Sequence, residues 1–191
     1  MENITENYRQ YKWFFTSTGV LVIGGKNSVQ NDALLKKIQD AHKEYIIMHT
    51  AAPGSPFTIF IASPEKVTTQ DIKECAIFTG ALSKAWKSGK KKTNIHIFKA
   101  SQIYKEKHMA EGTWGVIKSV KTMEVPLELA LTKQKGVLRA VPPSAAKKKL
   151  AKITPGKIEK KDLVSSLQKI DPSLSQEEIL AALPAGGLTI K

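Results

Sequence analysis

Short apolar runs occur along the chain beside longer stretches in which apolar residues recur at helical spacing. The aromatic run Lys12–Ser17 is followed by a Thr-Gly turn and by the apolar run Val20–Ile23, a pattern that predicts a β-hairpin. Two further runs, Tyr45–His49 and Phe57–Ala62, flank a Pro-Gly-Ser-Pro sequence at residues 53–56. Because Pro and Gly limit the conformations of a loop, we expect two strands joined by a loop of fixed geometry.

Two other stretches carry apolar residues three and four positions apart, which is typical of a helix with one buried face. The first covers about residues 28–42, and the second covers about residues 69–87. Each begins beside side chains that can accept hydrogen bonds from the free N–H groups of a first helical turn. These capping residues are Asn27 or Ser28 for the first helix, and Thr68 with Asp71 three positions later for the second.

The apolar pattern continues with short strand-like runs. Strands are expected at Ile95–Phe98, Trp114–Val120, Val125–Leu131 and Val137–Val141. Together the elements predict an α/β (α+β) fold, with a mixed, mostly antiparallel sheet and two main helices. We expect this domain to cover residues 1–141.

The pattern changes at Pro142-Pro143, and residues 142–191 are expected to form a basic linker and a small helical C-terminal extension. Helices are expected there at Ser144–Leu150, from about Lys161 to Ile170 and from Ser175 to Leu183, and the tail Pro184–Lys191 can add a strand.

The composition agrees with a packed globular protein. The chain has 191 residues, of which 41% are hydrophobic, and this is enough to bury a core without disulfides or metals. Its single cysteine, Cys75, lies in a helical pattern and is expected to be a small core residue in a reducing compartment. The N-terminal residues do not resemble a secretory signal, and no run approaches the roughly 18 apolar residues of a membrane span. We therefore expect a cytoplasmic protein without membrane contact.

Positive charge is concentrated in the middle of the sequence. The formal net charge is +13, yet residues 1–83 are balanced, with eight basic and eight acidic side chains. Residues 84–161 carry twenty basic and five acidic side chains, a balance of +15, and residues 162–191 have a balance of −2. A neutral part joined to a strongly basic segment indicates a polyanionic partner.

The basic segment begins with five lysines around Trp86 and Gly89: Lys84, Lys87, Lys90, Lys91 and Lys92. Cations near a helix C-terminus are favourable, but one or two would suffice for that, and five repel one another without a counter-charge. Lys105 and Lys107 continue the cluster, and a second basic run covers residues 147–161. Because the chain has only two arginines, this composition favours contacts with a phosphate backbone over the reading of base edges.

Aromatic residues accompany these charges, and each has two interpretations. Trp86, Tyr104 and Trp114 can stack on bases, or they can belong to the core, which is the more frequent situation.

Catalytic motifs do not stand out. The four histidines have no metal-ligand spacing, so neither a metal nor a cofactor is expected, and the sequence indicates a non-enzymatic protein. The sequence Gly24-Gly25-Lys26-Asn27 weakly resembles a phosphate-binding loop, although paired glycines more often form a simple turn. His49 precedes the Pro-Gly-Ser loop, where backbone N–H groups of Gly54 and Ser55 can bind a phosphate. Alternatively, His49 is a buried residue hydrogen-bonded to that loop.

Four sequence blocks, in one order, resemble the NFACT RNA-binding domain (NFACT-R) family over about residues 8–121. The blocks are His49-Thr-Ala-Ala-Pro-Gly-Ser-Pro-Phe57, Trp13–Ser17 with Leu21–Asn31, Glu74-Cys-Ala with Ser83-Lys-Ala85, and the lysine-rich stretch that ends at Gly112. The tail with Ile153–Lys157 is similar to that of archaeal stand-alone members. One feature departs from the family: many members have Asp-x-Trp-x-His before the loop, whereas Tyr45 and Ile47 precede His49 here.

The resemblance implies a non-enzymatic protein that binds RNA, either tRNA or rRNA, in association with the ribosome or its quality control. In longer relatives the domain belongs to proteins that bind the large subunit of stalled ribosomes and recruit tRNA. A DNA-binding module and, less favoured, a nucleic-acid hydrolase around His49 are the alternatives. The sequence does not indicate an oligomeric state. The residues expected to contact RNA are Lys26, Asn27, Asn31, His49, Gly54, Ser55, Ser83, Lys84, Lys87, Lys90, Lys91, Lys92, Lys105 and Lys107.

Overall fold

The computed structural model describes residues 5–117 and 121–191, which form two main sheets and five α-helices. The larger sheet has six strands in the order β1-β2-β4-β3-β5-β8, and all its described pairs are antiparallel. Its strands are β1 (Lys12–Phe15), β2 (Leu21–Gly24), β3 (Ile46–Thr50), β4 (Thr58–Phe60), β5 (Lys92–Lys99) and β8 (Lys121–Pro126). The expected hairpin, the two strands around the Pro-Gly-Ser loop and the mostly antiparallel α/β fold are thereby confirmed.

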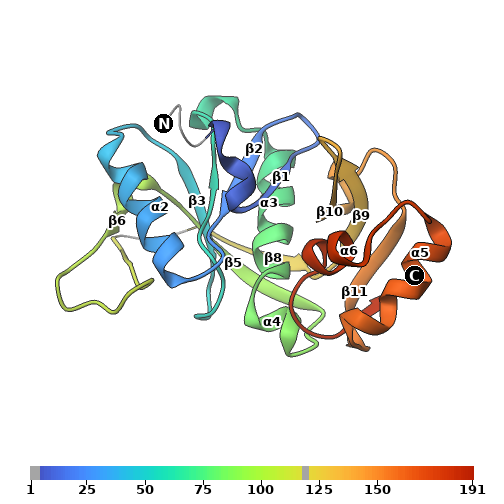
Figure 1. Cartoon of the computed structure of the whole chain (residues 1–191). Helices are drawn as coiled ribbons and strands as arrows, with labels where there is room; N and C mark the ends of the chain where they lie inside the picture. Colours follow the sequence, from blue (N-terminus) through green and yellow to red (C-terminus); the bar gives the residue numbers. More distant parts are fainter. Residues whose placement is uncertain (1–4, 118–120) are drawn as a thin grey trace.

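Helices cover both faces of this sheet. Figure 1 shows α2 (Ser28–Asp40) on one side and α3 (Thr69–Ala81) on the other. Successive strand residues point to opposite faces, so Trp13 packs in the cluster that contains Leu34 of α2, whereas Phe14 packs in the cluster that contains Phe78 of α3. Because both faces are covered, all four residues of β2 are buried.

The predicted caps of both helices are present. The Asn27 side chain accepts a hydrogen bond from the backbone N–H of Gln30, and Thr68 with Asp71 forms a reciprocal capping box. However, the second helix does not continue to Lys87 as predicted. It ends at Ala81, and Ser83 has extended backbone and caps a separate short helix, α4 (Lys84–Lys87), by accepting a hydrogen bond from the N–H of Ala85. A cap of this kind starts a new helix in a new direction.

The expected single strand Val125–Leu131 is also wrong. It divides into the end of β8 and the start of β9 (Leu129–Gln134), which belong to different sheets. The chain leaves the first sheet after Pro126, and a last hydrogen bond to it runs from the N–H of Leu127 to the carbonyl of Lys91 at 2.8 Å. The second sheet has the order β10-β9-β11-β12, and its other strands are β10 (Val137–Val141), β11 (Ala151–Ile158) and β12 (Leu188–Ile190).

The helix expected at Ser144–Leu150 does not form. Only a 3-10 turn at Pro143–Ala145 is present, followed by extended backbone at Ala146. Ala145 and Ala146 are buried in the core, and the N–H of Leu150 bonds to the carbonyl of Leu131, so the chain runs straight into β11. Burial of two small side chains and pairing with β9 outweigh the local helical propensity here.

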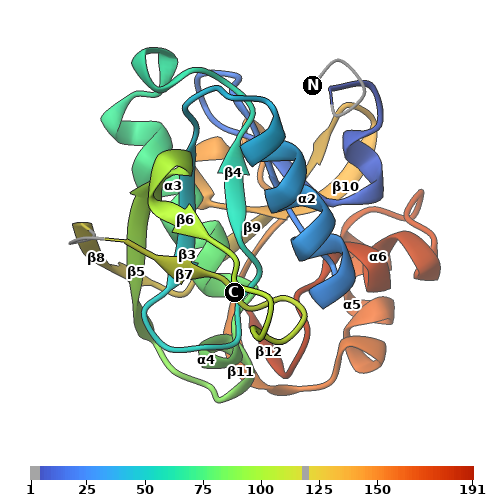
Figure 2. The same ribbon diagram turned by 90° about the vertical axis from the view of Figure 1, so that its left-hand side faces the viewer.

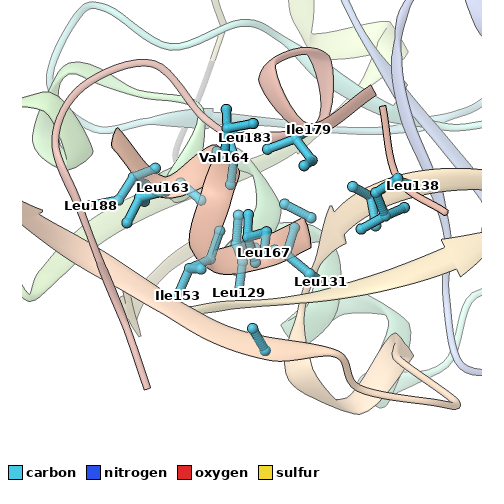
Figure 3. Close-up of a cluster of buried hydrophobic side chains, with 14 of the residues drawn as sticks. Leu129, Leu131, Leu138, Ile153, Leu163, Val164, Leu167, Ile179, Leu183 and Leu188 are labelled. Atoms are coloured by element: carbon cyan, nitrogen blue, oxygen red, sulfur yellow. The ribbon is translucent and has the colours of Figure 1, made fainter. Parts of the chain in front are cut away.

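The last part of the chain completes the second sheet. Helices α5 (Val164–Ile170) and α6 (Gln176–Ala182) form close to their expected positions, and the tail adds β12. Figure 3 shows Leu129 and Ile153 of the sheet facing Leu167 of α5. The boundary between residues 141 and 142 stays a prediction, and the second sheet takes two strands from each side of it.

Two short strands complete the described structure. They are β6 (Ile103–Tyr104) and β7 (Gly115–Val116), which pair antiparallel beside α2 (Figure 2). β7 covers only part of the expected strand Trp114–Val120, whose last three residues lie outside the described ranges. Among helices of residues 5–117 and 121–191, none combines the length and apolar character that a membrane crossing requires.

Candidate functional site

A cleft of about 520 Å³ opens on the α2 side of the six-stranded sheet. Three segments that are far apart in the sequence form its walls: the N-terminal end of α2, the β3–β4 loop, and the end of the 105–114 loop that connects β6 to β7. The candidate residues that line this cleft are Lys26, Asn27, Asn31, His49, Gly54 and Ser55. The structure therefore brings together the first six residues that were selected from the sequence.

His49 lies on β3, directly opposite His96 on β5, and both residues line the cleft. Its Nδ1 is 2.7 Å from the carbonyl oxygen of Thr50, which requires a proton on Nδ1, and its ring lies against Phe57 with 4.5 Å between ring centroids. Burial lowers the pKa of His49 below 6.5, and His96 lowers it further, while backbone hydrogen bonds with Thr50 and Ser55 partly oppose the shift. His49 is thus a half-buried, neutral imidazole at neutral pH, held in a fixed orientation.

The β3–β4 loop is held by hydrogen bonds at both ends. The N–H of Thr50 donates to the Ser55 hydroxyl at 3.0 Å, and the Thr50 hydroxyl donates to the carbonyl of Ala52 at 2.6 Å. Gly54 has a φ of +112°, a conformation that side chains rarely adopt, and its carbonyl accepts a hydrogen bond from the N–H of Lys84 at 2.9 Å. The loop is therefore fixed to the start of α4.

The opposite wall is the first turn of α2. Besides the Asn27 cap, the N–H of Lys26 donates to the Gln30 side chain at 2.8 Å. Gly25 is buried so closely against Asn31 that a Cβ atom there would lie 2.2 Å from the Asn31 Oδ1. That Oδ1 is buried and has no hydrogen-bond partner within the described residues. The Lys26 and Asn27 side chains remain exposed.

The third wall is held to α2 by an ion pair around Asp32. Lys105 Nζ lies 3.1 Å from the Asp32 carboxylate and also donates to the carbonyls of Ala110 and Thr113, and the Trp114 indole N–H donates to Asp32 at 2.7 Å. Partial burial alone would raise the pKa of Asp32, but hydrogen bonds from Gly112, Trp114 and Lys105 lower it below its ordinary value. Lys105 therefore has a structural role in holding this loop.

Next to the β3–β4 loop, four lysines form an exposed group around α4, which we call the lysine patch: Lys84, Lys87, Lys90 and Lys91. No salt bridge of the described residues involves any of them. Lys92 differs, because its ammonium group pairs with Glu124 at 3.3 Å at the start of β5. The patch and the cleft meet at Lys84, whose side chain lies over Gly54 so closely that a Cβ there would be 2.5 Å from the Lys84 Cδ.

The two remaining predicted site residues, Ser83 and Lys107, do not line the cleft. Ser83 is buried as the cap of α4, and Lys107 is exposed on the 105–114 loop. Several residues that line the cleft were absent from the sequence-based set, and His96 and Trp114 are two of them. The sequence does indicate Trp114 as a candidate base-stacking residue. The location of His96 opposite His49 depends on the register between β3 and β5, which no local sequence pattern indicates. Trp86 is fully buried and belongs to the core.

An acidic residue also lines the cleft. Glu111 accepts a hydrogen bond from the Ser28 hydroxyl at 2.7 Å, which ties the 105–114 loop to the first turn of α2. In residues 5–117 and 121–191, no group of three or more His, Cys, Asp or Glu side chains is placed to hold a metal ion.

The NFACT protein RNA binding domain family matches residues 10–118, which include all three walls of the cleft and the lysine patch. The chain belongs to this family. The resemblance seen in the sequence blocks is thereby confirmed, and the family points to a non-catalytic RNA-binding role for the domain.

The likeness to one relative extends beyond the family match. The archaeal Rqc2 homolog aRqcH of Methanocaldococcus jannaschii is 30% identical over 202 residues, which cover 96% of this chain and 29% of the relative. The second sheet and its helices are thus part of the shared region. The chain spans less than a third of the length of that protein.

A solved structure shares the fold. The C-terminal part of the fibronectin/fibrinogen-binding protein from Streptococcus suis superposes with a TM-score of 0.53 over 60% of this chain and 45% of that chain, at 19% identity. At that identity the likeness concerns the fold alone.

Proposed function

We propose that this NFACT RNA-binding domain binds structured RNA, either tRNA or rRNA, on one continuous face made of the cleft and the lysine patch. The observation that carries the proposal is the junction at Gly54 and Lys84, which joins the polar cleft to four exposed lysines without described counter-charges. A phosphate backbone crossing this face would neutralise the patch and place a nucleotide beside His49 and Trp114. The contribution of the protein is binding and positioning, without a chemical step.

The chemistry of the face favours the backbone of a folded RNA. Lysines are point charges suited to phosphate, and only Arg9 and Arg139 could read base edges with a guanidinium fork. Trp114, partly buried in the cleft wall, offers an aromatic ring to one base, and fixed polar groups at Asn27 and Ser55 suit the 2′-hydroxyl of a ribose. The face thus combines many phosphate contacts with a few places for a nucleotide.

The biological setting that we propose is the ribosome. The relative aRqcH is an Rqc2 homolog, and the family resemblance implies proteins of ribosome-associated quality control. We extend this to the present chain as a cytoplasmic partner of rRNA or tRNA, including those at the large ribosomal subunit. Because the match spans 29% of aRqcH, the activity of that whole protein is not part of the proposal.

A salt titration with a folded tRNA tests the proposal. We expect the affinity of the wild-type chain to fall steeply with salt. The triple variant Lys87→Gln, Lys90→Gln, Lys91→Gln is expected to make the negative slope of log K against log salt shallower by about two to three, since each phosphate contact contributes about 0.7–0.9 to its magnitude. The matched control is Lys36→Gln, Lys66→Gln, Lys169→Gln, which removes the same charge at exposed positions that line neither the cleft nor the patch. Equal slopes for the two triple variants would overturn the proposal.

Two further measurements separate the alternatives. Duplex DNA that competes with tRNA equally well at one salt concentration would favour a DNA-binding module instead, because 2′-hydroxyl contacts favour RNA. RNA turnover that is abolished by His49→Ala would favour a hydrolase. We expect neither result.

A further inference from the structure

A second cleft, of about 310 Å³, opens between β1 of the larger sheet and β10 of the smaller one, with Ala181 of α6 at its edge. Four cationic side chains line it: Arg9, Lys12, Lys26 and Arg139. They come from four separate segments of the chain, namely the 3-10 turn before β1, β1 itself, the loop before α2, and β10. The fold therefore gathers positive charge at a place where the sequence shows no basic run.

Arg139 is the fixed element of this cleft. Its side chain reaches from β10 to β1, where Nε and Nη2 donate to the carbonyl oxygen of Trp13 at 3.1 and 2.7 Å. Its guanidinium carbon lies 4.5 Å from the centroid of the Trp13 ring. A guanidinium has five N–H donors, and the described hydrogen bonds of Arg139 use two of them. The group is oriented and retains donors for a ligand.

The charge in this cleft has no balancing ion pair among the described residues. No salt bridge of the described residues involves Arg9, Lys12, Lys26 or Arg139. Burial lowers the pKa of Lys12, and the positive charges of Arg139, Lys160 and Lys26 lower it further. Burial also lowers the pKa of Arg139, to about 10. Partly buried like charges without a counter-ion are unfavourable, and an anion between them would remove that cost.

We propose that this second cleft is a phosphate-binding site in which Arg139 and Lys12 hold the anion and Arg9 and Lys26 stand at its edge. A planar guanidinium fork with ammonium groups beside it matches the oxygens of a phosphate group. The volume admits more than a phosphate alone, so the ligand is either a free phosphate compound or a phosphodiester of a nucleic acid. Lys26 also lines the first cleft, so one nucleic-acid strand can contact both sites.

The site does not depend on the proposed function, because inorganic phosphate can be used as the probe. The sequence makes the measurement selective: Arg9 and Arg139 are the only arginines of the chain, and both line this cleft. Their Nε–Hε signals in a ¹⁵N-¹H correlation spectrum therefore report on this cleft and on no other arginine. Sodium phosphate is titrated against sodium chloride at equal ionic strength, with the full chain.

We expect phosphate to shift the Arg139 Nε–Hε signal in a saturable manner and chloride to leave it almost unchanged. Lys12→Gln is expected to weaken phosphate binding at least five-fold, because the variant removes one of the two cations that hold the anion. The matched control Lys66→Gln removes an exposed charge outside the cleft and is expected to leave binding unchanged. No phosphate-specific shift in the wild-type chain, or equal binding by Lys12→Gln, would overturn the proposal.

A parallel titration with tRNA identifies the source of the phosphate. If tRNA moves the Arg139 signal at lower concentration than inorganic phosphate, the site takes a nucleic-acid backbone. If only inorganic phosphate moves it, the site takes a free phosphate compound. In both cases the phosphate site stands. Loss of tRNA affinity in the lysine-patch variant tests the proposed function separately, so failure of one proposal does not imply failure of the other.

Discussion

The backbone N–H of Lys84 donates a 2.9 Å hydrogen bond to the carbonyl of Gly54, and the Lys84 side chain lies directly over that glycine. This contact joins two segments thirty positions apart. It places the first lysine of the patch at the edge of the cleft that contains His49. The contact requires a glycine, since any side chain at position 54 would collide with Lys84 and would be strained at a φ of +112°.

Gly54→Ala is therefore expected to displace Lys84 and to lower the free energy of unfolding by about 1–3 kcal/mol. It is also expected to weaken tRNA binding. Urea unfolding and a tRNA titration measure the two effects. Gly19→Ala is the matched control, because Gly19 has a φ of +92° with open space around it. The control is expected to show backbone strain without loss of tRNA affinity, and equal tRNA affinities of the two variants would contradict the role of the contact.

The Asp32–Lys105 pair holds the 105–114 loop and makes a second prediction. Asp32→Asn is expected to lower the free energy of unfolding by about 1–3 kcal/mol at pH 7, because a partly buried ammonium loses its counter-charge. Since the pKa of Asp32 is lowered in the fold, this stabilisation exists above the unfolded pKa of about 3.8 and is lost as the pH falls through the folded pKa. The wild-type chain and the variant should thus converge in acid.

A double-mutant cycle with Lys105→Gln isolates the pair. We expect the double variant to be more stable than the sum of the two single losses predicts, as measured by urea unfolding. Strict additivity would show that the two side chains do not stabilise each other.

His49 makes the stability depend on pH in a predictable direction. Its pKa is lowered in the fold, first by burial, so the unfolded chain binds a proton more readily. The corresponding stability is complete above the unfolded pKa of about 6.5 and is lost as the pH falls through the folded value. Urea unfolding gives the free energy of unfolding at pH 7.5 and at pH 5.0. The decrease between these two pH values should be smaller for His49→Gln than for the wild-type chain. An identical loss in the two proteins would contradict this assignment.

Cys75 is expected to be unreactive in the folded protein. It is fully buried on α3, and burial raises the pKa of its thiol to about 12, so the thiolate is scarce at neutral pH. A disulfide reagent such as DTNB should react fully in guanidinium chloride and very slowly in buffer, with Cys75→Ala as the blank. Rapid reaction in buffer would mean that α3 opens without global unfolding.

Local patterns explain why much of the fold was predictable. The hairpin of β1 and β2 follows from two short apolar runs separated by a Thr-Gly turn, and the starts of α2 and α3 follow from side chains that bond to N–H groups three positions away. The wrong predictions share a different cause. Ser83 interrupts a helical pattern because α4 packs Trp86 against the second sheet, and no α-helix forms after the 3-10 turn Pro143–Ala145 because Leu150 pairs with β9.

The sequence by itself determined the fold class, the family, and the presence of a polar loop at His49 and of an excess of lysines after Ser83. These depend on residue order, spacing and composition within short segments. Only the tertiary structure decided that Gly54 meets Lys84, that His96 stands opposite His49, that Lys105 is bound by Asp32, and that Arg139 reaches Trp13. Each of these contacts joins residues that are thirty or more positions apart, and their partners are selected by strand register and core packing, which local sequence does not encode.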